Sequence, residues 1–95
     1  MTRLYYVYIL SCENGSLYTG YTNDLERRYR EHITGVGSKY TRAFKPIGIA
    51  QVWELEDKSV AMKMESYIKQ QSRQQKEKLI AEPHLIEMLF CTNDT

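Results

Sequence analysis

The sequence predicts a single small α/β domain of the α+β kind, in which a three-stranded, mostly antiparallel sheet is flanked by helices. The chain has 95 residues, 42% of them hydrophobic, which is enough for one compact core. Two strand-like segments are joined by a turn that contains Asn14-Gly15, the strongest short signal for a hairpin. The periodicity then changes in the order helix, strand, helix, helix, which is typical of a mixed domain. We expect one domain over residues 1–82 and a C-terminal arm or tail at 83–95.

Three segments have the composition of β-strands. Tyr5–Ser11 and Leu17–Tyr21 are rich in β-branched and aromatic residues and form the predicted hairpin. Ile47–Leu55 is the third predicted strand. Its alternation places one apolar set on a single face, which we expect helices to cover: Ile47, Ile49, Trp53 and Leu55.

The register of the hairpin decides which residues share a face. A two-residue loop at Asn14-Gly15 would place Tyr8 and Tyr18 on opposite faces of the sheet. A three-residue loop that starts at Glu13, with Gly15 in the left-handed region, would pair Tyr8 with Gly20 and bring both tyrosines to one face. We predict the three-residue loop, because only this register allows a site that contains two tyrosines.

The first predicted helix follows the hairpin. Asn23 with Glu26 resembles a capping box, and Gly35 is a favourable residue just beyond a helix end. The helix is therefore expected to run to about Thr34. One side of it carries, by the helical spacing, Leu25, Arg28, Tyr29, His32 and Ile33. Arg28 and His32 are neighbours at positions i and i+4.

The segment Gly35–Pro46 is predicted to be a loop, and it interleaves basic and aromatic side chains. Such a pattern suits a segment that follows phosphates and stacks on bases. We therefore assign nucleic-acid binding to Lys39, Tyr40, Arg42 and Lys45. The alternative is a long connector whose Tyr40 and Phe44 pack into the core, and the sequence leaves both open. The net charge is only +1, so the basic patch is local.

The C-terminal part of the chain is predicted to be helical. One helix starts at Asp57-Lys58-Ser59 and ends at about Gln71, with an apolar stripe formed by Ala61, Met64 and Ile68. A further helix starts at Ser72, which Gln75 supports as a cap, and ends at Pro83. The remaining residues are expected to form a short helix or packed arm at His84–Phe90 and a frayed end at Cys91–Thr95.

Glu65 lies within the apolar stripe of the second predicted helix. A carboxylate at such a position is costly unless it is paired, reaches water or binds a metal ion. The residue by itself therefore indicates either a salt bridge to a nearby Arg or Lys, an edge position, or a metal ligand.

Cysteines and hydropathy limit the class of protein. Cys12 and Cys91 are the only cysteines and lack CxxC spacing, which argues against a zinc site and against a disulfide scaffold. No charged-then-apolar leader and no apolar run of the ~18–20 residues of a membrane span is present. We expect a soluble, cytoplasmic protein without membrane association, as a monomer or weak homodimer.

Taken in order, these residues resemble the GIY-YIG nuclease superfamily, in particular its small stand-alone bacterial members of poorly characterised function. Tyr6-Val7-Tyr8 stands at the GIY position and Tyr18-Thr19-Gly20 at the YIG position. The helix residues from Leu25 to His32 match the family's helix, with Arg28 at its arginine. Met64–Lys69 matches the segment that carries the family's glutamate, here Glu65. The resemblance covers Tyr5 to Leu79.

The chain departs from the family pattern at four positions. Tyr6, Val7 and Thr19 replace residues of the two motifs, but the chemistry lies in the tyrosines. Tyr21 stands where some relatives have a lysine, so a lysine-assisted base is not expected here.

The resemblance implies a GIY-YIG-type endonuclease that hydrolyses phosphodiester bonds in DNA, in repair or processing, with RNA as the alternative substrate. It implies Mg²⁺ or Mn²⁺ as cofactor, with Glu65 as the metal ligand. The implied catalytic residues are Tyr8, Tyr18, Arg28, His32 and Glu65. Tyr18 would activate or orient water, Tyr8 would assist, and Arg28 would clamp the phosphate.

Two other functions are compatible with the sequence. The first is a catalytically silent nucleic-acid-binding module with the same fold, although a pure binder has no need of a carboxylate facing phosphate. The second is a small interaction protein that binds no nucleic acid, which the near-neutral charge permits. Each of the implied site residues could also be structural, and Glu65 could pair with Arg28 in the core.

Overall fold

The fold is a three-stranded antiparallel sheet with helices on both of its faces. The computed structural model describes residues 3–90, so the prediction for Cys91–Thr95 lies outside the described residues. In order, the elements are β1 (Tyr5–Cys12), β2 (Leu17–Thr22), α1 (Leu25–Thr34), α2 (Lys39–Ala43), β3 (Pro46–Leu55), α3 (Lys58–Lys69), α4 (Arg73–Ala81) and α5 (His84–Phe90). The strand order is β2-β1-β3, and β1 pairs antiparallel with both neighbours. The predicted fold class is confirmed.

One face of the sheet carries the hydrophobic core. Val7 and Ile9 of β1 and Trp53 of β3 pack against the predicted stripe of α3, which is fully buried. The last two helices complete this core through Leu79 of α4 and Ile86 of α5. Trp53 also donates a hydrogen bond from Nε1 to the carbonyl of Pro83 at 2.9 Å, which ties the α4–α5 connection to the sheet.

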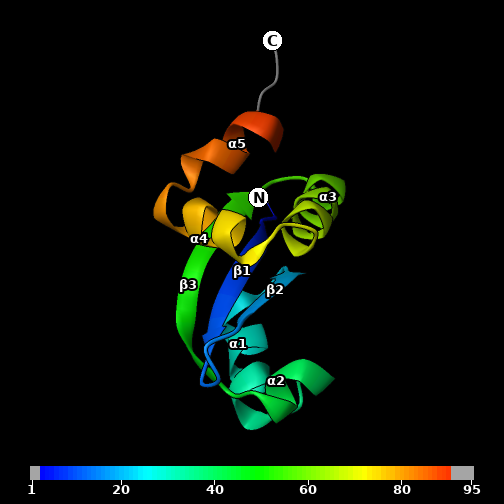
Figure 1. Ribbon diagram of the computed structural model, residues 1–95. Helices are drawn as coiled ribbons and strands as arrows, with labels where there is room; N and C mark the ends of the chain where they lie inside the picture. The colour runs from blue at the N-terminus through cyan, green and yellow to red at the C-terminus, as the bar shows by residue number, and fades with distance from the viewer. Residues whose placement is uncertain (1–2, 91–95) are drawn as a thin grey trace.

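The opposite face of the sheet carries Tyr8 and is covered by α1. Tyr8 and His32, the latter from α1, are both buried and hydrogen-bonded to each other. In Figure 1, α1 and α2 lie at the lower end of the sheet, whereas α3, α4 and α5 lie at the upper end. The two faces therefore differ in chemistry, one being apolar and the other containing polar groups.

The hairpin has the predicted three-residue register. Tyr8 is paired with Gly20 and Leu10 with Tyr18, so both tyrosines lie on one face. Gly15 has a φ of 85°, and the amide of Cys12 donates to the carbonyl of Ser16 at 2.9 Å. Positive φ at this loop position is the reason that glycine follows Asn14.

The prediction of a single apolar face on β3 is wrong. The partner of Ile9 is Gln51 and the partner of Leu10 is Ile49, so the ladder skips Ala50. A bulge of this kind moves the preceding residues to the other face of the sheet. Ile49 is accordingly 40% exposed, whereas Trp53, further along the strand, is 2% exposed.

A second irregularity places Ile47 outside the core. The ladder passes from the Ser11–Gly48 pair to the Cys12–Pro46 pair and skips Ile47. Ile47 is 70% exposed as a result. The alternation of the sequence assumes an unbroken ladder, and β3 is broken twice.

The helix ends are partly as predicted. Gly35 is left-handed with a φ of 88° and ends α1, as expected. The N-cap of α1 is Asp24 rather than Asn23, and its side chain accepts from the amide of Arg27 at 3.1 Å. The predicted start of α3 is confirmed, with Asp57 as its N-cap, and so is the predicted cap at Ser72.

The predicted loop Gly35–Pro46 contains a short helix, α2, so that prediction was wrong in part. Ser38 is its N-cap, and its hydroxyl accepts from the amide of Thr41 at 3.1 Å. The S-x-x-T spacing therefore supplies the nucleus of a helical turn. Within α2, Thr41 is buried, whereas Lys39 and Arg42 are exposed.

The packing of Tyr8 on Gly20 predicts a specific sensitivity of the hairpin. A Cβ at Gly20 would lie 2.5 Å from the Tyr8 hydroxyl oxygen, closer than atoms can approach, so Gly20→Ala must displace the buried tyrosine. We expect a loss of about 1–3 kcal/mol of unfolding free energy, measured by denaturant or thermal melting. Gly48→Ala is the matched control, because a Cβ there meets nothing within 4 Å. Equal stability of the two variants would contradict this packing.

Candidate active site

Tyr8 is held in a buried position between the sheet and α1. Its side chain is 1% exposed, and its hydroxyl lies 2.8 Å from Nε2 of His32. Burial raises the pKa of Tyr8 to about 12, and the charges of Tyr18 and Glu65 act in the same direction, while the nearby Arg28 guanidinium lowers it. Tyr8 is therefore a protonated phenol at neutral pH and acts through hydrogen bonds.

His32 connects Tyr8 to α2. The residue is fully buried, and burial is the main reason that its pKa is lowered, with the charge of Arg28 adding to the effect. The ring is therefore neutral at pH 7 and has one donor and one acceptor nitrogen. Its Nδ1 lies 2.8 Å from Oγ1 of Thr41, so both ring nitrogens have partners. A Cβ at Gly37 would lie 2.6 Å from Nδ1, so only glycine fits beside the ring.

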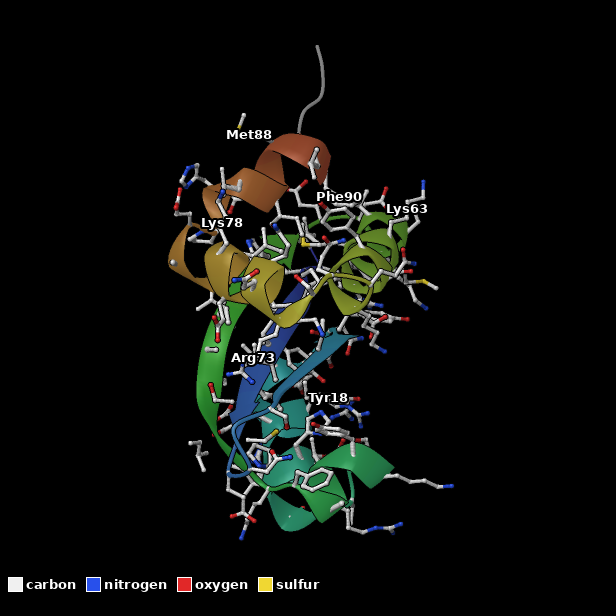
Figure 2. The ribbon with its side chains drawn as sticks, viewed as in Figure 1. Tyr18, Lys63, Arg73, Lys78, Met88 and Phe90 are labelled. Atoms are coloured by element: carbon white, nitrogen blue, oxygen red, sulfur yellow. The ribbon has the colours of Figure 1, made fainter. Side chains whose placement is uncertain are left out.

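Tyr18 lies on the same face as Tyr8 but is only half-buried. Its ring makes an edge contact with His32, with centroids 5.2 Å apart, and stacks on Tyr40 at 5.7 Å. Figure 2 shows Tyr18 on β2, close to α2. Tyr40, which the sequence assigns to base stacking, therefore has one ring face on Tyr18 and its other neighbour is Phe44.

Arg28 is oriented by two hydrogen bonds. One nitrogen donates to Oε1 of Glu31 at 2.9 Å, and the other terminal nitrogen donates to the carbonyl of Gly37 at 2.8 Å. The side chain is 33% exposed, and guanidinium has about five N–H donors, so donors remain for a ligand. The core ion pair between Arg28 and Glu65 that the sequence allows is not formed, because Arg28 is paired with Glu31 instead.

Glu65 of α3 has a largely buried carboxylate, with 19% of its side chain exposed. Its partner is the ammonium of Lys69 at 3.3 Å, one helical turn further on. The negative charge of Glu65 contributes to the raised pKa of Tyr8, so the carboxylate lies within electrostatic reach of the tyrosine. Helix α3, which carries Glu65, packs against both strands of the hairpin, β1 and β2.

The donor set around Glu65 suits some metal ions and not others. Among residues 3–90, no group of three or more His, Cys, Asp or Glu side chains could hold a metal ion. This excludes a zinc-type cage within that range. Mg²⁺ commonly takes one or two carboxylates and completes its shell with water and phosphate oxygens. A single, largely buried carboxylate within electrostatic reach of Tyr8 fits that kind of site.

The remaining residues assigned to nucleic-acid binding lie on or after α2. Lys39 and Arg42 are exposed on the helix, and Lys45 is exposed just beyond it. Together with the paired guanidinium of Arg28, they give this end of the molecule its basic character. In the part of the chain that the structure describes, no helix is long and apolar enough to span a membrane.

A cavity of about 540 Å³ lies elsewhere, at the start of α1. Its lining includes Tyr6, Leu25, Tyr29 and Ile49, and none of the residues assigned to catalysis. The cavity is therefore separate from the tyrosine cluster, and the chemistry of Tyr8, Tyr18, Arg28 and Glu65 is the better guide to a site.

Sequence reasoning missed Thr41, Gly37 and Ser38. Thr41 reaches His32 across nine residues of chain, and Gly37 both packs on His32 and accepts from Arg28. The cap spacing of Ser38 and Thr41 was the available signal, because a helical turn there directs Thr41 inward.

Over most of its length the chain is similar to known proteins. Residues 4–78 match the GIY-YIG catalytic domain. A UPF0213 protein from Halalkalibacterium halodurans is 46% identical over 77 residues, which cover 81% of this chain and 82% of that protein. A UPF0213 protein from Natronomonas pharaonis is 47% identical over 82 residues, which cover 86% of this chain and 96% of that protein.

A solved structure is similar as well. The solution NMR structure of a UPF0213 protein from Bacillus halodurans has a TM-score of 0.56 and 45% sequence identity, and the match covers 82% of this chain and 83% of that chain. Because the match to the catalytic domain spans most of the chain and includes both tyrosine motifs, this chain belongs to the GIY-YIG family.

Proposed function

We propose that the protein is a divalent-metal-dependent endonuclease that hydrolyses phosphodiester bonds in DNA, in repair or processing. The observation that carries the proposal is the clustering of two tyrosines, a neutral histidine and an oriented arginine, with the largely buried carboxylate of Glu65 within electrostatic reach of Tyr8. The tyrosines, Arg28 and His32 come from three consecutive elements, β1, β2 and α1, whereas Glu65 comes from α3 further along the chain. Their convergence favours a common task.

Arg28 is proposed to hold the scissile phosphate. Its guanidinium is already oriented by Glu31 and Gly37, so little side-chain freedom is lost when a phosphate oxygen binds the remaining donors. Two parallel N–H bonds from a fixed guanidinium also stabilise the charge that develops on the phosphate during hydrolysis.

Tyr18 is proposed to orient the attacking water, with Tyr8 as its partner. Tyr8 is buried and its pKa of about 12 keeps it protonated, so it cannot act as a base near neutral pH. Tyr18 is half-buried and therefore reaches solvent, where water is available.

Glu65 is proposed as the protein ligand of Mg²⁺ or Mn²⁺, and GIY-YIG nucleases are generally dependent on such ions. When bound, the metal ion supplies stabilisation of the leaving oxygen and of the phosphate charge. The Lys69 ammonium lies 3.3 Å from a Glu65 oxygen, so a bound ion would compete with Lys69 for the carboxylate.

A silent binding module with the same fold is the main alternative. Such a module would bind through the basic residues of the α2 region. It would require neither Glu65 nor the hydrogen bonds that orient Arg28. Incubation of the protein with supercoiled plasmid and with branched DNA, with and without Mg²⁺, separates the possibilities. A nuclease cuts only with metal, a binding module retards DNA without cutting it, and an interaction protein does neither.

Glu65→Gln should abolish cleavage and leave DNA binding in place. The substitution keeps the shape of the side chain but removes the charge that attracts the cation. Its exposed partner Lys69 contributes an i,i+4 pair of only about 0.3–0.5 kcal/mol, so the melting temperature should change little. Plasmid cleavage, a gel-shift assay and a melting curve on the same preparation measure the three properties.

Glu77→Gln is the matched control for this experiment. Glu77 is also a helical glutamate in an i,i+4 ion pair, with Arg73 at 2.9 Å, but it is exposed and lies on α4. This control should cut DNA at the wild-type rate. A folded Glu65→Gln protein that also cuts at the wild-type rate would remove Glu65 from the chemistry, and an unfolded one would assign it a structural role.

Removal of single charges near α2 should weaken binding to all DNA sequences alike. Lys39→Gln, Arg42→Gln and Lys45→Gln each remove one exposed cation. If each cation contacts a phosphate, the slope of log K against log salt should fall by about 0.9 for each variant, because fewer counterions are released. Fluorescence anisotropy over a salt series measures the slope. Lys78→Gln serves as the control, since Lys78 extends from α4 at the opposite end of the molecule (Figure 2). Unchanged slopes in all three variants would leave this segment with a structural role alone.

A further inference from the structure

One short segment, residues 37–41, contacts three of the side chains assigned to catalysis, Arg28, Tyr18 and His32. The carbonyl of Gly37 accepts from Arg28 at 2.8 Å. The ring of Tyr40 stacks on Tyr18. The hydroxyl of Thr41 lies 2.8 Å from His32, which in turn contacts Tyr8. Of these contacts, only that of Thr41 belongs to a row of hydrogen-bonded polar side chains that are all buried.

The buried chain consists of Tyr8, His32 and Thr41, which are 1%, 0% and 1% exposed. Each polar atom in it must find its partner within the protein, because water cannot supply one. Ser38 continues the chain, with its hydroxyl 2.9 Å from that of Thr41, and this residue is only half-buried. The chain therefore starts at the catalytic face of the sheet and ends near solvent.

The hydrogen bonds can run in two directions, and the surroundings favour one. Beside Tyr8 lies the Arg28 guanidinium, a pure donor, so the Tyr8 oxygen has to accept there and its proton must point to His32. Nε2 then accepts from Tyr8, Nδ1–H donates to Thr41, and the Thr41 hydroxyl donates to Ser38. In the reverse direction the Tyr8 proton would point toward a cation, without an acceptor among the described hydrogen bonds.

We propose that Thr41 is a positioning residue: it holds His32 in the tautomer protonated at Nδ1 and thereby fixes the Tyr8 hydroxyl as an acceptor toward the substrate side. The catalytic part of this inference rests on the proposed nuclease function. A hydroxyl that already gives its proton to His32 can only accept, and the donor beside it is Arg28, the guanidinium proposed to hold the phosphate. Thr41 acts through His32 and contacts no substrate itself.

The tautomer of His32 can be measured directly in the unaltered protein. The chain contains two histidines, and His84 is exposed and serves as an internal reference. A long-range ¹H–¹⁵N spectrum at neutral pH distinguishes a protonated from an unprotonated ring nitrogen. We expect a protonated Nδ1 and an unprotonated Nε2 in His32. A protonated Nε2 would overturn the proposal, whether or not the protein cuts DNA.

Two substitutions at Thr41 test the link to catalysis. Thr41→Val keeps the shape and removes the hydroxyl, so Nδ1 loses its partner and the single tautomer should give way to a mixture. We expect the single-turnover cleavage rate to fall ~10- to 100-fold, as for other partners that orient a functional histidine, while the Kd for DNA stays unchanged. Thr41→Ser restores the hydroxyl and should restore both the tautomer and the rate. Thr34→Val is the control, because Thr34 is an exposed residue of α1 that takes no part in the hydrogen bonds from Tyr8 to Ser38.

The outcomes separate this inference from the proposed function. If the wild-type protein fails to cut DNA under all metal conditions, the nuclease proposal fails, and the tautomer spectra alone decide the role of Thr41. If the wild type cuts and a folded Thr41→Val protein cuts at the same rate, the positioning role is overturned. If Thr41→Val fails to fold, the wild-type tautomer and the rate of Thr41→Ser still decide it, since a slow Thr41→Ser protein with an intact hydroxyl contact would also contradict the proposal.

Discussion

The hydrogen bond between Tyr8 and His32 is the contact on which the rest of the site depends. It joins the central strand to α1 in a place from which water is excluded, at a distance of 2.8 Å. Three features of the backbone make room for it. The hairpin register sets Tyr8 opposite Gly20, the absence of a side chain at Gly20 accommodates the tyrosine ring, and Gly37 leaves space beside the imidazole. A methyl group at either glycine would occupy the volume of this pair.

The two faces of the sheet differ in whether certain buried polar atoms have hydrogen-bond partners. On the face of Tyr8, each described polar atom of the chain from Tyr8 to Thr41 has a partner, which is the condition under which buried polar groups stabilise a single arrangement. On the apolar face, Thr19 stands in place of an isoleucine of the second motif, and its hydroxyl has no hydrogen-bond partner in the described structure. A buried hydroxyl without a partner costs about 1–3 kcal/mol. The hydrogen-bonded residues beside the tyrosines therefore have their partners, whereas the Thr19 hydroxyl on the other face has none in the described structure.

Local patterns predicted much of this arrangement, because they are governed by interactions over a few residues. The Asn-Gly turn, the left-handed Gly35 and the stripe of Ala61, Met64 and Ile68 all follow from such interactions. The bulges in β3 could not be predicted, since the strand composition is the same with or without a skipped residue. The ion-pair partner of Arg28 could not be predicted from the sequence either, because both Glu31 and Glu65 were available. The packing of α1 and α3 decides between them, and Arg28 pairs with Glu31. The role of Thr41 depends on a contact across nine residues, which no periodicity encodes.

The central claim is that the tyrosines, Arg28 and Glu65 form one metal-dependent site, and paramagnetic NMR with Mn²⁺ tests it most directly. Mn²⁺ broadens the signals of nuclei close to it, so a titration of ¹⁵N-labelled protein locates the ion without DNA and without a measurement of activity. We expect broadening centred on Glu65 and reaching Tyr8 and Tyr18, and we expect Glu65→Gln to remove this effect. Broadening centred on the exposed carboxylates of α4, or broadening that persists in Glu65→Gln, would rule out a metal site at Glu65.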